Sequence, residues 1–193
     1  MASTFWNVPN TLSLSRLPLA VVLFACIAHE LWLVGLVVFL VAAITDWLDG
    51  WWARRFQQFT AIGRSLDPLT DKVLVCGTFI YLIPVPSSHI MPWMVTVIIA
   101  RELLITGLRG IVEATGKKFG ADWFGKLKTV LQMTVLIGIL LLQTLRGQEW
   151  LMDVIPTLEY IYLVLLGAMI FATIGSGVQY TIKAVKLLNN NQI

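Results

Sequence analysis

The chain has 193 residues, of which 58% are hydrophobic and only 13% are charged, and its mean hydropathy is +0.80. These values lie outside the range of ordinary soluble domains and predict one polytopic membrane domain, residues 1–193. The net charge is +3 and the isoelectric point is near 9.0. Basic loops that face anionic lipid account for this charge, so we do not expect a nucleic acid partner.

Apolar stretches long enough to cross a hydrocarbon core of ~30 Å predict an all-α fold with six transmembrane helices. An even number of spans places both termini on one side. Thirteen of the fourteen Lys and Arg residues fall on that side, and only Arg146 falls opposite, so the positive-inside rule makes the termini cytoplasmic. The predicted spans are residues 12–28, 31–56, 67–83, 91–111, 126–145 and 157–182.

The first span is preceded by PNTLSLSR, Pro9 to Arg16. From the residues alone, this segment is a helix entry in which Asn10 or Thr11 acts as the cap and Arg16 lies at the interface. No charged start followed by a small-residue cleavage site precedes it, so we expect the first span to insert and to stay in the membrane.

Four aspartates occur in the second and third segments, within DWLDGWWARRFQQFTAIGRSLDPLTD. Asp46 and Asp49 are spaced i and i+3, and Asp67 and Asp71 are spaced i and i+4, so each pair points to one face of its helix. Ionised carboxylates beside a membrane are costly unless they are compensated. All-oxygen ligands favour a hard divalent cation, Mg²⁺ before Zn²⁺, and the segment therefore predicts a metal site.

Small and basic residues accompany the aspartates. Gly50 and Ala53 follow Asp46 on nearly the same helical face and clear space for a ligand or a neighbouring helix. Arg54 supplies a charged fork that suits phosphate oxygens. Gly63 lies one turn before the third aspartate, and Pro68 suits a helix start or a kink.

This pattern, DxxDGxxAR followed after eight residues by GxxxDxxxD, resembles the signature of the CDP-alcohol phosphatidyltransferase family. The resemblance implies an integral membrane enzyme that moves a phosphatidyl or phospho-alcohol group from a CDP-linked donor to an acceptor alcohol, with Mg²⁺ or Mn²⁺ as cofactor. It also implies a homodimer. All eight signature positions are filled, by Asp46, Asp49, Gly50, Ala53, Arg54, Gly63, Asp67 and Asp71.

The same resemblance implies roles for individual residues. The four aspartates hold the metal, and Asp71 is also the general base. In the family a stretch like PNTLSLSR borders the donor site, and here Ser13 stands where threonine is usual. The residues that the resemblance places along the donor are Asn10, Arg16, Asp49, Gly50, Ala53, Arg54 and Gly63.

The fourth and fifth segments carry further charges. In IIARELLITGLRG, Glu102 either forms a structural ion pair with an arginine or shares a polar stripe with Thr106 and Arg109 at i, i+4 and i+7. In GKLKTVLQ, Lys126 and Lys128 lie at a helix start, where the helix dipole disfavours cations. They indicate either an anionic ligand or ordinary cytoplasmic charge.

Outside the signature, PNTLSLSR, ARE and GKLKT resemble the bacterial phosphatidylglycerophosphate synthases. This resemblance implies CDP-diacylglycerol as donor, glycerol 3-phosphate as acceptor, and an active site on the cytoplasmic face of the bacterial inner membrane. Arg109, Lys126 and Lys128 are then the candidates for binding the acceptor phosphate. Two alternatives remain at this point: another acceptor such as serine, inositol phosphate or phosphatidylglycerol, and a divalent-cation transporter, which the clustering of carboxylates near one membrane face disfavours.

Overall fold

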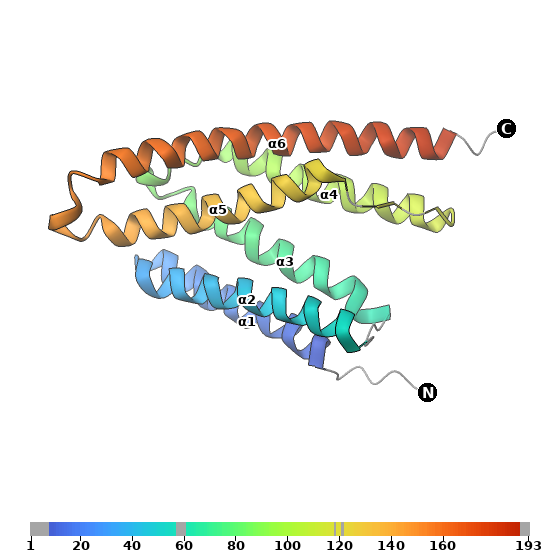
Figure 1. Ribbon diagram of the computed structural model, residues 1–193, viewed down its shortest axis with the longest axis horizontal. Coiled ribbons are helices and arrows are strands. Elements are labelled where there is room, and N and C mark those ends of the chain that lie inside the picture. Colours follow the sequence, from blue (N-terminus) through green and yellow to red (C-terminus); the bar gives the residue numbers. More distant parts are fainter. Residues whose placement is uncertain (1–7, 57–60, 118, 121, 190–193) are drawn as a thin grey trace.

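A computed structural model of the chain describes residues 8–56, 61–117, 119–120 and 122–189, and all regular structure within these ranges is helical (Figure 1). Each predicted span corresponds to one long helix, so the prediction of an all-α fold with six helices is confirmed. Two short 3₁₀ turns, η1 (Pro86–Ser88) and η2 (Glu149–Leu151), lie in the connections. The long helices are α1 (Val8–Ala28), α2 (Trp32–Phe56), α3 (Ala61–Leu82), α4 (Pro92–Ala114), α5 (Trp123–Leu145) and α6 (Ile155–Asn189).

Two helix bounds differ most from the prediction, because an apolar run marks only the hydrophobic part of a helix. Helix α3 begins at Ala61 and not at 67, so Pro68 lies inside the helix and does not start it. Helix α6 continues to Asn189, beyond the predicted end at 182. A helix needs good helix formers and not hydrophobic ones, and the Lys, Ala and Leu residues after position 182 continue it past the apolar stretch.

The six helices form two groups. Helix α1 packs against α2 and α3, while α6 packs against α4 and α5; α2 contacts α5, and α3 contacts both α4 and α5. In Figure 1, α3 runs obliquely between the pair α1–α2 and the group α4–α6. Helix α1 begins and helix α6 ends at the same end of the bundle.

The core extends through the whole bundle because every helix contributes to it. A second, smaller cluster joins Ile105 and Val112 of α4 to Phe119 and to Tyr180 and Ala184 of α6. The main cluster takes a fully buried side chain from each of the six helices, among them Leu23, Phe39, Phe79, Ile98, Leu136 and Met169.

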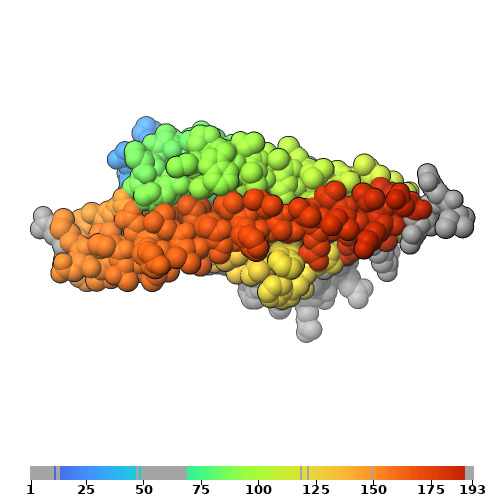
Figure 2. All heavy atoms as spheres, turned by 90° about the horizontal axis from the view of Figure 1, so that it is seen from above, coloured from blue at the N-terminus to red at the C-terminus, as the bar shows by residue number. Residues whose placement is uncertain are grey.

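The outer surface is apolar as well. Leu103, Val130 and Phe171 are 67%, 61% and 75% exposed, and similar side chains occur on all six helices. Contiguous exposed hydrophobic surface of this kind marks contact with lipid or with another protein. By length and composition, α5 and α6 are able to cross a membrane. Figure 2 shows α6 lying along the length of the molecule, between the green face of α3 and α4 and the start of α5.

Candidate active site

An ion-pair cluster joins α1, α2 and α3. The guanidinium of Arg16 is fully buried, and its Nη1 lies 2.8 Å from Oδ1 of Asp46 and also pairs with Oδ1 of Asp71. The two carboxylates are 48% and 45% exposed. One aspartate from each predicted pair therefore reaches the same cation, as expected if α2 and α3 present their acidic faces to a common space.

The other residues of the signature lie on the same two helices. The backbones of Asp49 and Asp67 are helical, within α2 and α3, so the predicted helical spacing of both pairs is confirmed. Their side chains lie outside the described part of the structure. The same holds for the predicted donor residues Asn10, Gly50, Ala53, Arg54 and Gly63.

Among the side chains that the structure describes, no group of three or more His, Cys, Asp or Glu residues is placed to hold a metal ion. Only Asp46 and Asp71 of the four predicted ligands belong to this described set. The metal site therefore remains a prediction.

A cavity of about 500 Å³ lies beside this cluster, between α3, α4, α5 and α6. The predicted phosphate-binding residues Arg109, Lys126 and Lys128 all line it, and so does Asp71. Asp71 thus belongs both to the ion-pair cluster and to the cavity. The charged lining is strongly basic: Lys72, Arg101, Arg109, Lys126 and Lys128 against Asp71 and Glu102.

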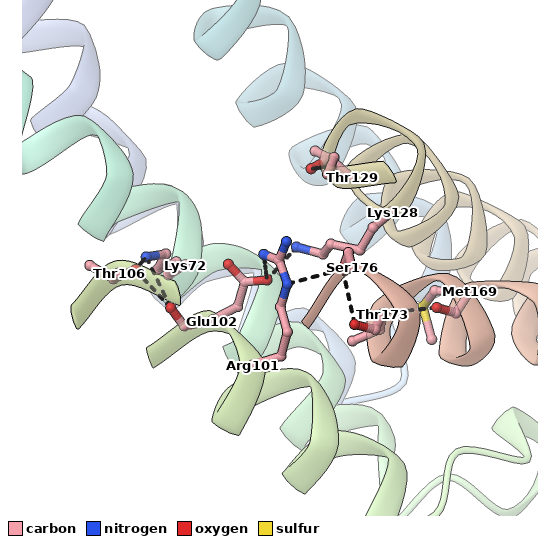
Figure 3. A network of polar contacts seen from close by, with 10 residues as sticks. Lys72, Arg101, Glu102, Thr106, Lys128, Thr129, Met169, Thr173 and Ser176 are labelled. Carbon is pink, nitrogen blue, oxygen red and sulfur yellow. Dashed lines mark hydrogen bonds and ion pairs between the residues drawn. The ribbon is translucent and has the colours of Figure 1, made fainter. Parts of the chain in front are cut away.

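Glu102 is the centre of a polar network in this cavity (Figure 3). Its Oε1 accepts hydrogen bonds from Nη1 of Arg101, at 3.1 Å, and from Nζ of Lys128 on α5. Arg101 in turn donates from Nε to Oγ of Ser176 on α6, at 3.2 Å. One of the two alternatives for Glu102, an ion pair with an arginine, is present. Its pairing with Lys128 was not predicted, because nothing in the sequence indicates which α5 residue faces α4.

The two lysines of GKLKT have different surroundings. Lys126 is exposed, whereas the side chain of Lys128 is 5% exposed and buried against Glu102. Lys128 is therefore not a solvated cytoplasmic charge. Burying a lysine costs free energy, which its carboxylate partner offsets.

The polar residues Glu102, Thr106 and Arg109 of α4 all line the cavity. Lys72 of α3 donates to Oγ1 of Thr106 and lies 3.5 Å from the carbonyl oxygen of Glu102. The Nε of Arg109 is buried, and among the described residues it has no hydrogen-bond partner. Lys72 was not among the predicted site residues, although its position directly after Asp71 in the sequence indicated that it lies near the site.

A sequence profile described as CDP-alcohol phosphatidyltransferase matches residues 6–175. The chain belongs to the CDP-alcohol phosphatidyltransferase family. This confirms the resemblance seen in the signature, and it disfavours the alternative of a divalent-cation transporter.

Bacterial relatives of this phosphatidyltransferase are similar over most of its length. A Bacillus subtilis (strain 168) protein is 35% identical over 151 residues, which are 70% of this chain and 77% of the relative. A Salmonella choleraesuis (strain SC-B67) protein is 38% identical over 144 residues, with the same coverage. A Shigella flexneri serotype 5b (strain 8401) protein is 34% identical over 184 residues, 91% of this chain and 93% of the relative. All three are named CDP-diacylglycerol–glycerol-3-phosphate 3-phosphatidyltransferase.

In this member of the phosphatidyltransferase family, α6 fixes the start of α5 beside the cavity. The hydroxyl of Tyr180 accepts a hydrogen bond from the backbone N–H of Asp122, at 2.6 Å, and Lys183 pairs with the Asp122 carboxylate at 2.7 Å. Gly125 permits this contact, since a Cβ there would lie 2.7 Å from the Tyr180 oxygen. These contacts hold the start of α5, and with it Lys126 and Lys128, against the cavity.

Proposed function

We propose that this phosphatidyltransferase moves the phosphatidyl group from CDP-diacylglycerol to glycerol 3-phosphate and releases CMP. One observation carries the proposal: Asp71 and the basic residues Arg109, Lys126 and Lys128 line the same cavity. A carboxylate next to an anion-binding pocket suits an acceptor that carries a phosphate at one end and a reacting hydroxyl at the other. The names of the bacterial relatives support the same pair of substrates.

The basic residues bind the acceptor phosphate. Arg109 offers a fork of N–H donors, and its buried Nε, unpartnered among the described residues, is available to an anion. Lys126 is exposed at the cavity, where a soluble substrate enters. Lys128 is shared between Glu102 and the substrate, and the carboxylate holds the ammonium in place before the phosphate arrives.

Asp71 acts as the general base. The acceptor hydroxyl oxygen attacks the phosphatidyl phosphorus, the bond from that phosphorus to the CMP oxygen breaks, and CMP leaves with the electron pair. The hydroxyl proton passes to the Asp71 carboxylate, which requires a contact of about 2.6–3.2 Å in the reactive complex. Arg16 orients this carboxylate by pairing with it from the buried side.

We further propose that Asp46, Asp49, Asp67 and Asp71 hold Mg²⁺, or Mn²⁺ in its place. The described part of this set fits a hard cation. The carboxylates of Asp46 and Asp71 come from different helices, are half-exposed and converge on the Arg16 guanidinium, and a hard cation prefers such carboxylate oxygens as ligands. When bound, the ion supplies positive charge to the donor diphosphate. The acyl chains of the donor remain in the bilayer, and Gly50, Ala53 and Arg54 lie along its CMP part. The other residues proposed to border the donor are Asn10, Arg16, Asp49 and Gly63.

For the membrane arrangement we propose six spans with both termini in the cytoplasm of a bacterial cell and the active site at the cytoplasmic face. The bundle supports this arrangement, because α1 begins and α6 ends at the same end. Arg146, the single basic residue predicted on the outside, follows α5 directly and lies in its connection to α6. We also propose a homodimer in the membrane.

The decisive experiment is an acceptor panel. Purified protein is supplied with CDP-diacylglycerol, Mg²⁺ and, in separate reactions, glycerol 3-phosphate, serine, inositol phosphate or phosphatidylglycerol, and CMP release is measured. We expect CMP release with glycerol 3-phosphate and formation of phosphatidylglycerophosphate. Faster release with one of the other acceptors would assign the chain to another branch of the family.

A further inference from the structure

Gln132 of α5 is a buried polar residue that the arrangement above does not use. Its side chain lines the cavity, and the residue is 3% exposed. The amide Nε2 is buried and has no hydrogen-bond partner within the described part of the chain. Leaving a buried amide without a partner is unfavourable, so a residue of this kind in a substrate cavity indicates a partner supplied by the substrate.

A second glutamine on the same helix shows that α5 satisfies a buried amide where the amide has only a structural role. Gln143 is 8% exposed, near the other end of the helix, and its Nε2 donates to Oγ of Ser87 at 2.5 Å. Gln132 has no corresponding protein partner among the described residues. The difference between the two glutamines is that Gln132 faces the cavity.

The position of Gln132 determines what it meets. It lies one turn after Lys128 on the same face of α5, and of the α5 residues that line the cavity it is the farthest from the helix start. The basic residues take the acceptor phosphate, and Asp71 takes the proton of the reacting hydroxyl. The polar group of glycerol 3-phosphate that remains is its central hydroxyl. An amide that both donates and accepts is suited to a hydroxyl, which does the same.

We propose that Gln132 hydrogen-bonds the central hydroxyl of the acceptor and thereby selects glycerol 3-phosphate over phosphorylated alcohols that lack this group. The inference rests on the proposed function, because it assigns a specificity contact within the same acceptor cavity. A site built to hydrogen-bond a hydroxyl rejects an analogue without it, since the buried amide is then left unpaired.

The test compares two acceptors, glycerol 3-phosphate and 3-hydroxypropyl phosphate, which differ only in the central hydroxyl. For the wild-type protein, kcat/KM for CMP release should be at least about tenfold higher with glycerol 3-phosphate. In Gln132→Met, which keeps the volume and removes the amide, kcat/KM with glycerol 3-phosphate should fall about tenfold or more. With 3-hydroxypropyl phosphate it should stay within about twofold, so that the preference is lost.

The matched control is Gln143→Met, which should keep the wild-type preference. An equal fall with both acceptors in Gln132→Met would make the residue structural and overturn the inference. Equal use of both acceptors by the wild-type protein would overturn it without any variant, so the test does not depend on how well Gln132→Met folds. If the wild-type protein used neither phosphorylated acceptor but did use another alcohol, the proposed function would be refuted, and with it the contact assigned to Gln132.

Discussion

Arg16 and Asp71 are 55 positions apart in the chain and form an ion pair in which the guanidinium is fully buried while the carboxylate is 45% exposed. The cation thus has no access to solvent, whereas the anion is in part exposed. Asp46 pairs with the same guanidinium nitrogen at 2.8 Å. Arg16 therefore fastens α1 to the two acidic helices and leaves both carboxylates accessible from the other side.

The first prediction concerns stability. Asp46→Asn combined with Asp71→Asn removes the two described carboxylate partners of the buried Arg16 guanidinium and should lower the free energy of unfolding by about 1–3 kcal/mol. Adding Arg16→Met to the double variant removes the buried charge and should restore most of that loss without restoring activity. Thermal unfolding in detergent measures both effects. Equal stability of the wild-type and double-variant proteins would show that the cluster is not structural.

The second prediction concerns metal dependence. Excess chelator should abolish CMP release, and added Mg²⁺ or Mn²⁺ should restore it. Asp67→Asn keeps the shape of the side chain and removes its charge, so it should abolish turnover while the protein still folds. Full activity in chelator, or in Asp67→Asn, would exclude the proposed metal site.

The third prediction separates the two lysines of the cavity. Lys126→Gln should raise the acceptor KM without loss of stability, because Lys126 is exposed. Lys128→Met should raise the acceptor KM and also destabilise the protein, because Glu102 loses a partner that is 5% exposed. Each lysine variant loses one charge-assisted hydrogen bond to the substrate phosphate, which corresponds to about 1.5–3 kcal/mol of acceptor-binding free energy.

Steady-state kinetics with each substrate varied in turn, together with thermal unfolding, measures these effects. Adding Glu102→Gln to Lys128→Met should recover stability and leave the acceptor KM high. A change in the donor KM alone, in either lysine variant, would mean that this basic pocket belongs to CDP-diacylglycerol.

The fourth prediction concerns orientation in the membrane. In a background with Cys26→Ala and Cys76→Ala, single cysteines replace Ala114, exposed at the end of α4, and Gln148, exposed between α5 and α6. An impermeant thiol reagent should label the first position only from the cytoplasmic side and the second only from the outside. The reverse pattern would place the active site on the wrong face for a cytoplasmic acceptor.

The fold class and the family were accessible from sequence because both depend on local patterns. The number of helices followed from the apolar stretches, and the signature fixed which residues of α2 and α3 share a helical face. The bounds of α3 and α6 were less well predicted, since hydrophobicity marks the apolar part of a helix and not its end.

The sequence by itself determined the acidic faces at Asp46 and Asp71 and the presence of basic residues at Arg109, Lys126 and Lys128, because helical periodicity is a property of neighbouring residues. Only the tertiary structure decided that Arg16 pairs with both carboxylates, that Lys128 is buried against Glu102, and that Gln132 faces a cavity with no protein partner among the described residues. These contacts join different helices, and their pairing depends on how each helix is rotated and shifted against its neighbours. Packing across the whole bundle sets that rotation, and no local pattern in the chain records it.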